Sequence, residues 1–540
     1  MPRPQKTIFY TQKEWYMAKS NGTRKALKEL SLEQVLWNCR VVLRNKCNKP
    51  NNRDAVLALI FLKFAGDKFE KRRQEIVAEE GDVPVFLEKP AFYLAANVFY
   101  LDETSRWPYI VRNAGDDKIA VMLDQAMAGI EDKNESLKGA LPQRFFSSLG
   151  VSGNDIKALI DEVNKISQER FHEKDLIGRV YEYFLQQFAM DEAKEKGEFY
   201  TPKAIVNLIA ELIEPYKGRI YDPCCGSGGM FVQSLKFVES HHGNKSEVSV
   251  YGQESDPDTY RLAKMNLAIR GISNNLGERN ASSFLDDRHK DLKVDFIMAN
   301  PPFNLKNWRN ANQLSGDPRW AGYGVPPVSN ANYAWILHML SKLDVSHGIA
   351  GFLLANGALG AGGEEYVIRR QLIENDKIEA VIVLPREMFY STDISVTLWI
   401  INNNKKARVL NKRKLRDRRN EVLFIDLRTW NTNVYEKSYV TFNDEQIAAV
   451  KKIYAGWQGE ERKYKNIPEL CKSAKITEIR KNKYSLVPSK YIKFIDHDLD
   501  IDYKKEMKRI QKEMKEMLRA EKESQEMLEA AFEGIGYGIK

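Results

Sequence analysis

The spacing of hydrophobic residues divides the chain into three stretches. Up to about residue 195 apolar residues recur every three or four positions, as in Leu32–Leu43 and Val56–Phe64, which is typical of amphipathic helices. Beyond that, short apolar runs of strand length alternate with helical spacing, as in α/β domains. After Asp500 one long helical pattern remains. We therefore predict a helical N-terminal domain over 1–195, an α/β domain over 196–480 and a C-terminal helical tail over 481–540.

The N-terminal stretch holds a further strongly apolar helix over 176–185 and no residues with catalytic spacing. It is either a helical platform for DNA or a partner, or a plain packing domain. In the tail, apolar residues follow an alternating four-three spacing with Lys and Glu between them, ended by glycines from Gly534 onward. This seam predicts a partner helix, from another chain or from this chain's own domains. Its positions are Tyr503, Met507, Ile510, Met514, Met517, Ser524, Leu528 and Ala531.

The α/β stretch contains a nearly continuous apolar run, Val294–Ala299, of the kind found in buried parallel strands. Asn300-Pro301-Pro302-Phe303 follows it, and two prolines cannot donate to a sheet ladder. The chain must therefore leave the sheet here, at the carboxyl edge where open α/β sheets bind ligands.

This turn suits a planar base with an exocyclic amine. The side-chain oxygen of Asn300 and the carbonyl of Pro301 can accept hydrogen bonds from its two N–H groups and aim the nitrogen lone pair at an electrophile. Phe303 would stack on the base, which must first leave the duplex. The alternative interpretation is an ordinary turn after a core strand.

A second strand-turn-helix runs from Arg219–Asp222 through Pro223–Gly229 into a helix from Met230. The loop is not a phosphate-binding P-loop, because no Gly-Lys-Ser/Thr follows, and Phe231 replaces the third glycine of a dinucleotide fingerprint. The next strand, Val248–Gly252, ends at Glu254, which can accept hydrogen bonds from a ribose. Together these features predict a nucleoside pocket without pyrophosphate, for which S-adenosylmethionine is the candidate.

Three other segments bear on the site. Thr201 is predicted to N-cap a helix with Pro202 in its first turn. The loop after Phe303 mixes aromatic and basic residues beside the pocket, so it either contacts DNA or is ordered only by a partner. The basic run Lys405–Arg419 predicts a solvated hairpin tip, with phosphate contact as the alternative. The aromatic and basic residues of the loop are Lys306, Trp308, Arg309, Arg319, Trp320 and Tyr323.

Composition narrows the class. The 540 residues are 43% hydrophobic and 29% charged, as in ordinary globular proteins. The net charge of +9 gives mild support to a polyanionic partner. Five cysteines without metal-site spacing, no apolar run of transmembrane length and no signal-peptide core fit a cytoplasmic protein without a structural metal.

Four segments in this order, Gly197–Lys203, Asp222–Met230, Gln253-Glu254 and Asn300–Phe303, resemble N6-adenine DNA methyltransferases of the gamma arrangement. More narrowly, the whole chain resembles the modification subunit of type I restriction-modification systems, bacterial or archaeal. The resemblance implies a Rossmann-like S-adenosylmethionine-dependent methyltransferase domain, double-stranded DNA as substrate, and a tail that docks on a specificity subunit. It further implies two copies of this chain in a complex with a restriction subunit.

By this resemblance Asn300, Pro301, Pro302 and Phe303 bind the flipped adenine. One departure is visible, since Ser282-Ser283 stands where the family tends to carry an acid near the cofactor's adenine. The residues implied to line the cofactor site are Glu198, Phe199, Tyr200, Thr201, Pro202, Lys203, Asp222, Gly226, Ser227, Gly228, Gly229, Glu254 and Ser283.

Two other functions remain open from the sequence. Asn-Pro-Pro-aromatic turns also serve methylation of protein glutamine side chains, although the long loop and the tail argue against that substrate. Alternatively, the chain is a non-catalytic DNA-clamping scaffold whose cofactor site has weakened at Ser282.

Overall fold

The structure is a computed structural model of the chain. Outside the residues that it describes lie most of the helix expected over 176–185 and the turn with Glu198, Phe199 and Tyr200. The described residues are 31–166, 183, 201–389, 394–430, 435–436, 439–461, 463–495, 502–534 and 537.

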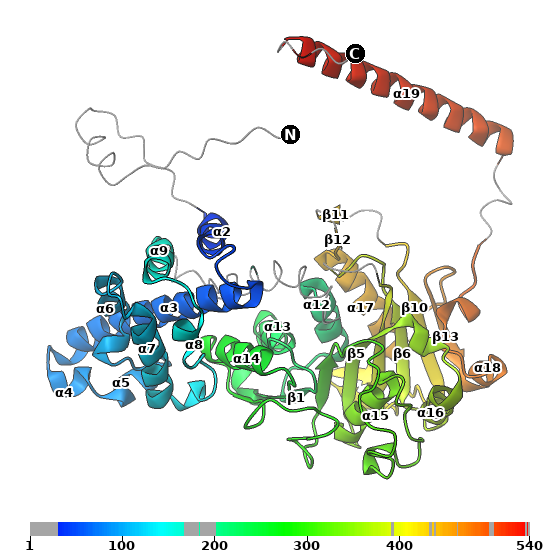
Figure 1. Cartoon of the computed structure of the whole chain (residues 1–540). Helices are drawn as coiled ribbons and strands as arrows, with labels where there is room; N and C mark the ends of the chain where they lie inside the picture. Colours follow the sequence, from blue (N-terminus) through cyan, green and yellow to red (C-terminus); the bar gives the residue numbers. More distant parts are fainter. Residues whose placement is uncertain are drawn as a thin grey trace.

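The described N-terminal part is helical, as the spacing predicts, and packs against one side of the α/β domain (Figure 1). Leu262, Met265 and Ala268 of α14 (Pro257–Ile269) belong to the same apolar core as the N-terminal helices. These helices are α2 (Leu32–Val42), α3 (Lys49–Glu80), α4 (Pro84–Leu87), α5 (Pro90–Leu94), α6 (Trp107–Arg112), α7 (Ile119–Lys133), α8 (Phe145–Ser148) and α9 (Gly153–Val163).

Among the described residues, one nine-stranded sheet has the order β13-β10-β6-β7-β5-β4-β1-β2-β3. β1 pairs in parallel with both β2 and β4, whereas β7 runs antiparallel between β5 and β6. The strands are β1 (Gly218–Asp222), β2 (Val248–Gly252), β3 (Asn274–Asn275), β4 (Phe296–Ala299), β5 (Ile349–Ala355), β6 (Ile378–Val383), β7 (Val396–Asn402), β10 (Glu421–Asp426) and β13 (Cys471–Lys475).

The chain passes from β1 outward to β2 and β3, then returns to β4 on the other side of β1. This is the switch point of the sheet, where ligands of open α/β folds bind. Since β1 and β4 are parallel neighbours, the glycine-rich loop after Asp222 and the turn after Ala299 emerge side by side.

Helices cover both faces of the sheet (Figure 1). One apolar core joins α12, α13 and α17 to one face, and another joins α15 and α16 to the opposite face. The mixed α/β fold is therefore confirmed. The helices are α12 (Lys203–Ile213), α13 (Gly229–Ser240), α15 (Asn332–Lys342), α16 (Gly363–Glu374), α17 (Asp444–Gln458) and α18 (Ile476–Lys481).

Small hairpins complete the domain. The basic run does form one, from β8 (Arg408–Leu410) and β9 (Arg413–Leu415), and β11 (Tyr435–Glu436) pairs with β12 (Tyr439–Val440). The prediction that this run is solvated is wrong for two residues near the ends of the run, because Lys405 is 3% exposed and Arg418 is fully buried. Each is paired with an acidic residue of the sheet region rather than left for phosphate.

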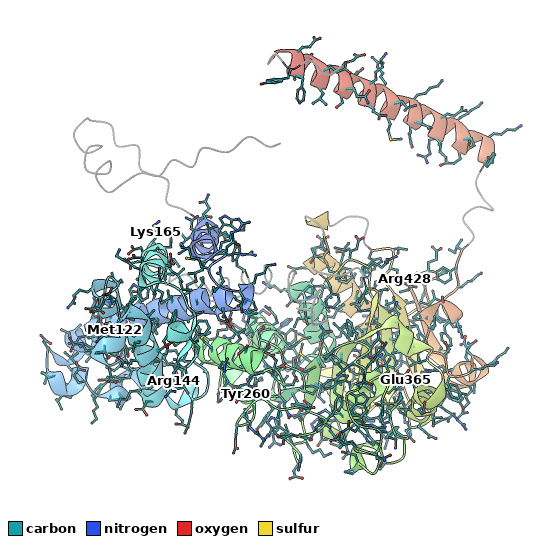
Figure 2. All side chains as sticks on the ribbon, in the orientation of Figure 1. Met122, Arg144, Lys165, Tyr260, Glu365 and Arg428 are labelled. Carbon is teal, nitrogen blue, oxygen red and sulfur yellow. The ribbon has the colours of Figure 1, made fainter. Side chains whose placement is uncertain are left out.

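The tail is the helix α19 (Tyr503–Gly534), and none of its residues is buried (Figure 2). The tail begins later than predicted, because Leu486, Tyr491 and Ile492 still belong to the core on one face of the sheet. No helix among the described residues is long and apolar enough to cross a membrane.

Candidate functional site

A cavity of about 170 Å³ lies at the carboxyl edge of β1, β2 and β4. It brings together residues from the glycine-rich loop, the end of β2, the segment after β3 and the Asn300 turn, as the motif order predicts. Its lining residues are Pro223, Cys224, Gly226, Glu254, Ser255, Ser282, Ser283, Phe284, Asn300, Pro301, Pro302, Leu305, Trp308 and Trp335.

The glycine-rich loop is shaped by left-handed backbone at Gly226 (φ 52°) and Gly228 (φ 80°). A Cβ added at Gly226 would meet no atom within 4 Å, so the absent side chain leaves space beside the cavity. Asn266 of α14, buried, donates to the carbonyl of Ser227 at 2.7 Å. Ser227, Gly228 and Gly229 do not line the cavity. They hold the loop and lead into α13.

Glu254 lines the cavity with a carboxylate fixed by three backbone amides. The N–H groups of Gly226, Ser255 and Asp256 donate to it at 3.0, 2.7 and 2.9 Å. Burial raises the pKa of Glu254, whereas these amides lower it. The glycine-rich loop and the acid at the tip of β2 are thus directly joined. Oε1 is fully used by Ser255 and Asp256, whereas Oε2, which accepts from Gly226, retains a lone pair for a ligand hydroxyl.

Asp222 is placed differently from the expectation, since it is buried at the end of β1 and does not line the cavity. Its carboxylate accepts from the N–H of Cys224 at 3.0 Å. Burial raises the pKa of Asp222 to about 7. Asp222 therefore acts on the cavity through the turn that it holds.

Asn300 contacts the segment before α12 rather than standing alone. Its amide nitrogen donates to the hydroxyl of Thr201 at 3.0 Å. The predicted N-cap role of Thr201 is wrong, because Pro202 occupies that position and α12 has no side-chain cap. The contact directs the other amide atom, the oxygen that can accept from a base amine, away from Thr201.

The other turn and helix residues divide between the cavity and its surroundings. Pro301 and Pro302 line the cavity, whereas Phe303 does not and stands edge-on to Phe389 at 6.2 Å between ring centroids. Pro202 is buried, and Lys203 is exposed at the start of α12.

Sequence reasoning placed Trp308 beside the pocket but missed Phe284 and Trp335, which form an aromatic wall with it. The ring of Phe284 lies 4.6 Å from that of Trp308 and 4.2 Å from that of Trp335, and all three line the cavity. Phe284 follows Ser283 directly, which was a usable signal, whereas Trp335 lies inside the apolar helix α15 and has none. Ser283 is buried and its hydroxyl donates to the carbonyl of Pro223.

The loop after Phe303 is built on its own side chains, which corrects the interpretation of a loop ordered only by a partner, whereas its contact with DNA stays a prediction. Arg309 is 7% exposed and donates to four backbone carbonyls of the loop, and the indole nitrogens of Trp308 and Trp320 donate to two more. Arg309 and Trp320 are therefore buried within the loop, whereas Trp308 also lines the cavity. Lys306 is exposed.

Comparison with known proteins shows the family of the chain. Residues 172–499 match the family model described as N-6 DNA Methylase, and residues 32–166 match the HsdM N-terminal domain. The chain is 41% identical over 410 residues to the type I restriction enzyme HindI methylase subunit of Haemophilus influenzae, covering 74% of this chain and 88% of that protein.

Two further relatives extend the match. The MjaIX methylase subunit of Methanocaldococcus jannaschii is 35% identical over 502 residues, or 89% of this chain and 88% of that protein. The crystal structure of a type I methyltransferase subunit from Streptococcus thermophilus shares the fold, with a TM-score of 0.70 and 23% identity over 85% of this chain and 99% of that one. The chain therefore belongs to the N-6 DNA methylase family, as a methylase subunit of a type I restriction-modification system.

Proposed function

We propose that the chain transfers the methyl group of S-adenosylmethionine to N6 of adenine in double-stranded DNA at the cavity between the glycine-rich loop and the Asn300 turn. N6-adenine methylation of DNA is the reaction of the family. Family membership therefore favours methylation of DNA over the two alternatives, methylation of protein glutamine side chains and a non-catalytic scaffold. The observation that carries the residue assignment is that Asn300, Pro301 and Pro302 line the same cavity as Gly226 and Glu254.

The residues present fit S-adenosylmethionine. Gly226 leaves open space beside the cavity, and Glu254 presents a fixed acceptor for a ribose. The ring of Phe284 offers an apolar face for a purine. When bound, the cofactor supplies an electrophilic methyl group on a positively charged sulfur.

On the substrate side, Asn300 and Pro301 orient the target amine. The amide oxygen of Asn300 and the carbonyl of Pro301 each accept a hydrogen bond from one of its two N–H groups, so its lone pair points at the methyl group. Thr201 fixes which way the Asn300 amide faces. The stacking of Phe303 on the base stays a prediction, because its ring packs against Phe389 and does not line this cavity.

The partners implied by membership in a type I system are DNA, a specificity subunit and a restriction subunit. We further propose that two copies of this chain bind one specificity subunit through α19. The apolar stripe of α19 supports this, because Met507, Ile510 and Met514 are exposed by 39%, 42% and 57%.

Labelled methyl transfer tests the function. The complex with its specificity subunit is incubated with tritiated S-adenosylmethionine and adenine-containing duplex, and the digested DNA is analysed for labelled N6-methyladenine. Label at that position supports the proposal. Label on protein alone, or DNA binding without any transfer, would contradict it.

Thr201→Val should lower kcat about fivefold, because a lost hydrogen bond to Asn300 costs about 1 kcal/mol and frees the amide to rotate. Thr201→Ser keeps the acceptor and should retain most of the activity. Both variants are compared with the wild type at saturating DNA and cofactor. Equal rates for the valine variant and the wild type would exclude the orienting role.

Cofactor affinity should fall as pH decreases below about 7. The pKa of Asp222 is raised to about 7, so its carboxylate gains a proton in that range, and a neutral carboxyl no longer attracts a cationic ligand or holds the Cys224 amide as strongly. The limit is about tenfold per pH unit. Calorimetric titration at pH 6, 7 and 8 measures it, and Asp222→Asn should flatten the dependence.

The same raised pKa has the opposite effect on the stability of the free protein. A carboxyl that holds its proton more tightly when folded contributes stability at low pH, and this contribution is lost as pH rises from about 4 to about 7. If acidification lowers both the melting temperature and the cofactor affinity, and Asp222→Asn shows the same two changes, then other groups are responsible.

A further inference from the structure

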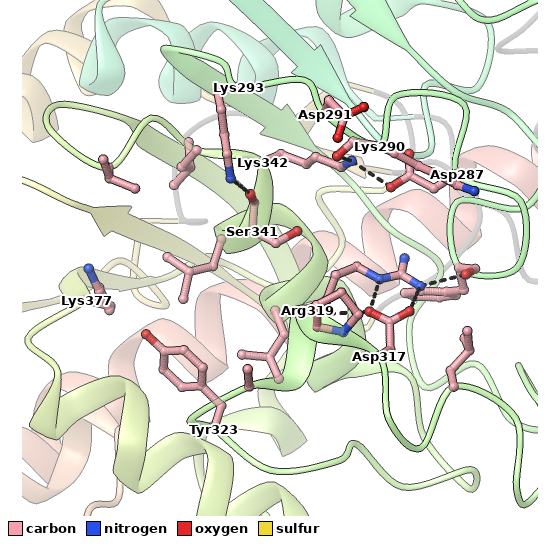
Figure 3. A pocket seen from close by; sticks show the side chains of 18 of the residues that line it. Asp287, Lys290, Asp291, Lys293, Asp317, Arg319, Tyr323, Ser341, Lys342 and Lys377 are labelled. Carbon is pink, nitrogen blue, oxygen red and sulfur yellow. Dashed lines mark hydrogen bonds and ion pairs between the residues drawn. The ribbon is translucent and has the colours of Figure 1, made fainter.

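Arg319, in the loop after the Asn300 turn, has the guanidinium with the most complete set of contacts near the site. Its Nε and one terminal nitrogen donate to the carboxylate of Asp317 at 2.8 and 2.7 Å, and the pair is about 10% exposed (Figure 3). The remaining three N–H bonds go to two backbone carbonyls and a histidine. All five donors of the arginine are thus engaged.

The two carbonyls belong to Ser283 and Phe284, at 2.9 and 2.7 Å, which line the cofactor cavity. Arg319 itself does not line it. It lines instead a separate pocket of about 740 Å³ (Figure 3). Phe284 lines both cavities, so this segment is a wall between them.

His338 extends the contacts to β1. Burial lowers the pKa of His338 to about 3, so the ring is neutral at physiological pH. Its Nδ1 must accept from Arg319 at 3.0 Å, because a guanidinium only donates. Its Nε2 therefore carries the proton and donates to the hydroxyl of Tyr221 at 3.1 Å, directly before Asp222.

The wall needs support from outside because it lacks a side-chain acid. Ser282 and Ser283 stand where a carboxylate was expected, and the hydroxyl of Ser283 is already used on the carbonyl of Pro223. Recognition of a purine at this wall is thereby left to the backbone, the Ser282 hydroxyl and the Phe284 ring. The position of that backbone is fixed by Arg319.

We propose that Arg319 is a positioning residue that holds the Ser283–Phe284 wall in the shape that binds the cofactor's adenine. The inference rests on the proposed function and deepens it, since it links the loop beside the target base to cofactor affinity. A lysine at this position cannot reproduce the contacts, because its ammonium is a single point and not a planar fork.

The test is Arg319→Lys in the full chain, with cofactor Kd measured by calorimetry without DNA. We expect Kd to rise about tenfold or more, because the wall loses hydrogen bonds from a charged donor. At saturating cofactor, kcat and the Kd for DNA should stay within about threefold of the wild type, by the split between binding and turnover.

Arg309→Lys is the matched control. Arg309 is as buried and also donates to loop carbonyls, but none of them belongs to Ser283 or Phe284. Its guanidinium lies 5.2 Å from the ring centroid of Trp308, a cation–π contact that a lysine can keep. Equal weakening of cofactor binding in both variants would overturn the proposal in favour of general loop damage. Unchanged cofactor Kd in Arg319→Lys, with or without weaker DNA binding, would overturn it as well.

If Arg319→Lys does not fold, the double variant Asp317→Asn/Arg319→Gln removes both charges without leaving either unpaired. It should fold and still bind cofactor weakly; wild-type cofactor affinity in it overturns the proposal. The cofactor titration is independent of methyl transfer. A wild type that binds cofactor but transfers no methyl group to DNA would therefore contradict the proposed function alone.

Discussion

Asn300→Ala should reduce kcat for methyl transfer by about 10³-fold, because it removes the side-chain acceptor that orients the target amine, and comparable losses follow removal of one preorganised polar group elsewhere. Cofactor affinity should change little, since the contacts with the glycine-rich loop and Glu254 remain. Single-turnover transfer of tritiated methyl to duplex DNA, with calorimetric cofactor binding in parallel, measures both quantities.

Asn312→Ala provides the control for this substitution. Asn312 is exposed in the following loop, so the same chemical change there should leave kcat within about twofold, as surface substitutions usually do. Near-normal turnover by Asn300→Ala would remove the basis of the catalytic assignment. A large loss of cofactor affinity would instead show that Asn300 mainly shapes the cavity.

Those parts of the site that follow strands could be predicted from the sequence. The apolar run before Asn300 ends at two prolines that stop a ladder, and the strand before Glu254 is short and regular, so their positions at the sheet edge follow from local pattern. The order of the motifs then places them together at the switch point, and the cavity confirms this for Gly226, Glu254 and Asn300.

Side-chain partners could not be predicted in the same way, because hydrogen bonds join residues far apart in sequence. Thr201 looked like a local helix cap, but its hydroxyl is used by Asn300. Arg309 and Arg319 looked like surface cations beside a DNA site, but both are drawn inward by backbone carbonyls that no linear pattern displays. A basic residue in an irregular loop can serve either purpose, and only burial distinguishes them.

Lys405 and Arg418 show the same ambiguity within the basic run. Arg418 donates to Glu379 of β6 at 3.2 Å, and Lys405 donates to Asp376 at 2.5 Å and to the carbonyl of Glu421 at 2.7 Å. The run that looked like a solvated tip therefore ties the β8–β9 hairpin to the strands of the sheet.

Arg418→Met should lower the free energy of unfolding by about 3–5 kcal/mol, because it leaves the carboxylate of Glu379 buried without its cationic partner. Burial alone would raise the pKa of Glu379, but Arg418 and the amides of Gln458 and Asn402 bring it below the ordinary value. Denaturant unfolding of both proteins measures the difference.

The pH dependence and two further variants test the cause of this loss. With Arg418 the lowered pKa of Glu379 contributes stability above about pH 4, which is lost on acidification. Without Arg418 burial dominates and raises that pKa, so the difference in stability between the two proteins should narrow as pH falls from 7 to 4.

Arg418→Met/Glu379→Leu, which removes both charges, should regain most of the stability. Arg419→Met, at an exposed neighbouring ion pair, should change it by less than about 1 kcal/mol. A gap that widens on acidification would contradict the assignment, because it would mean that the carboxylate does not limit the stability of the variant.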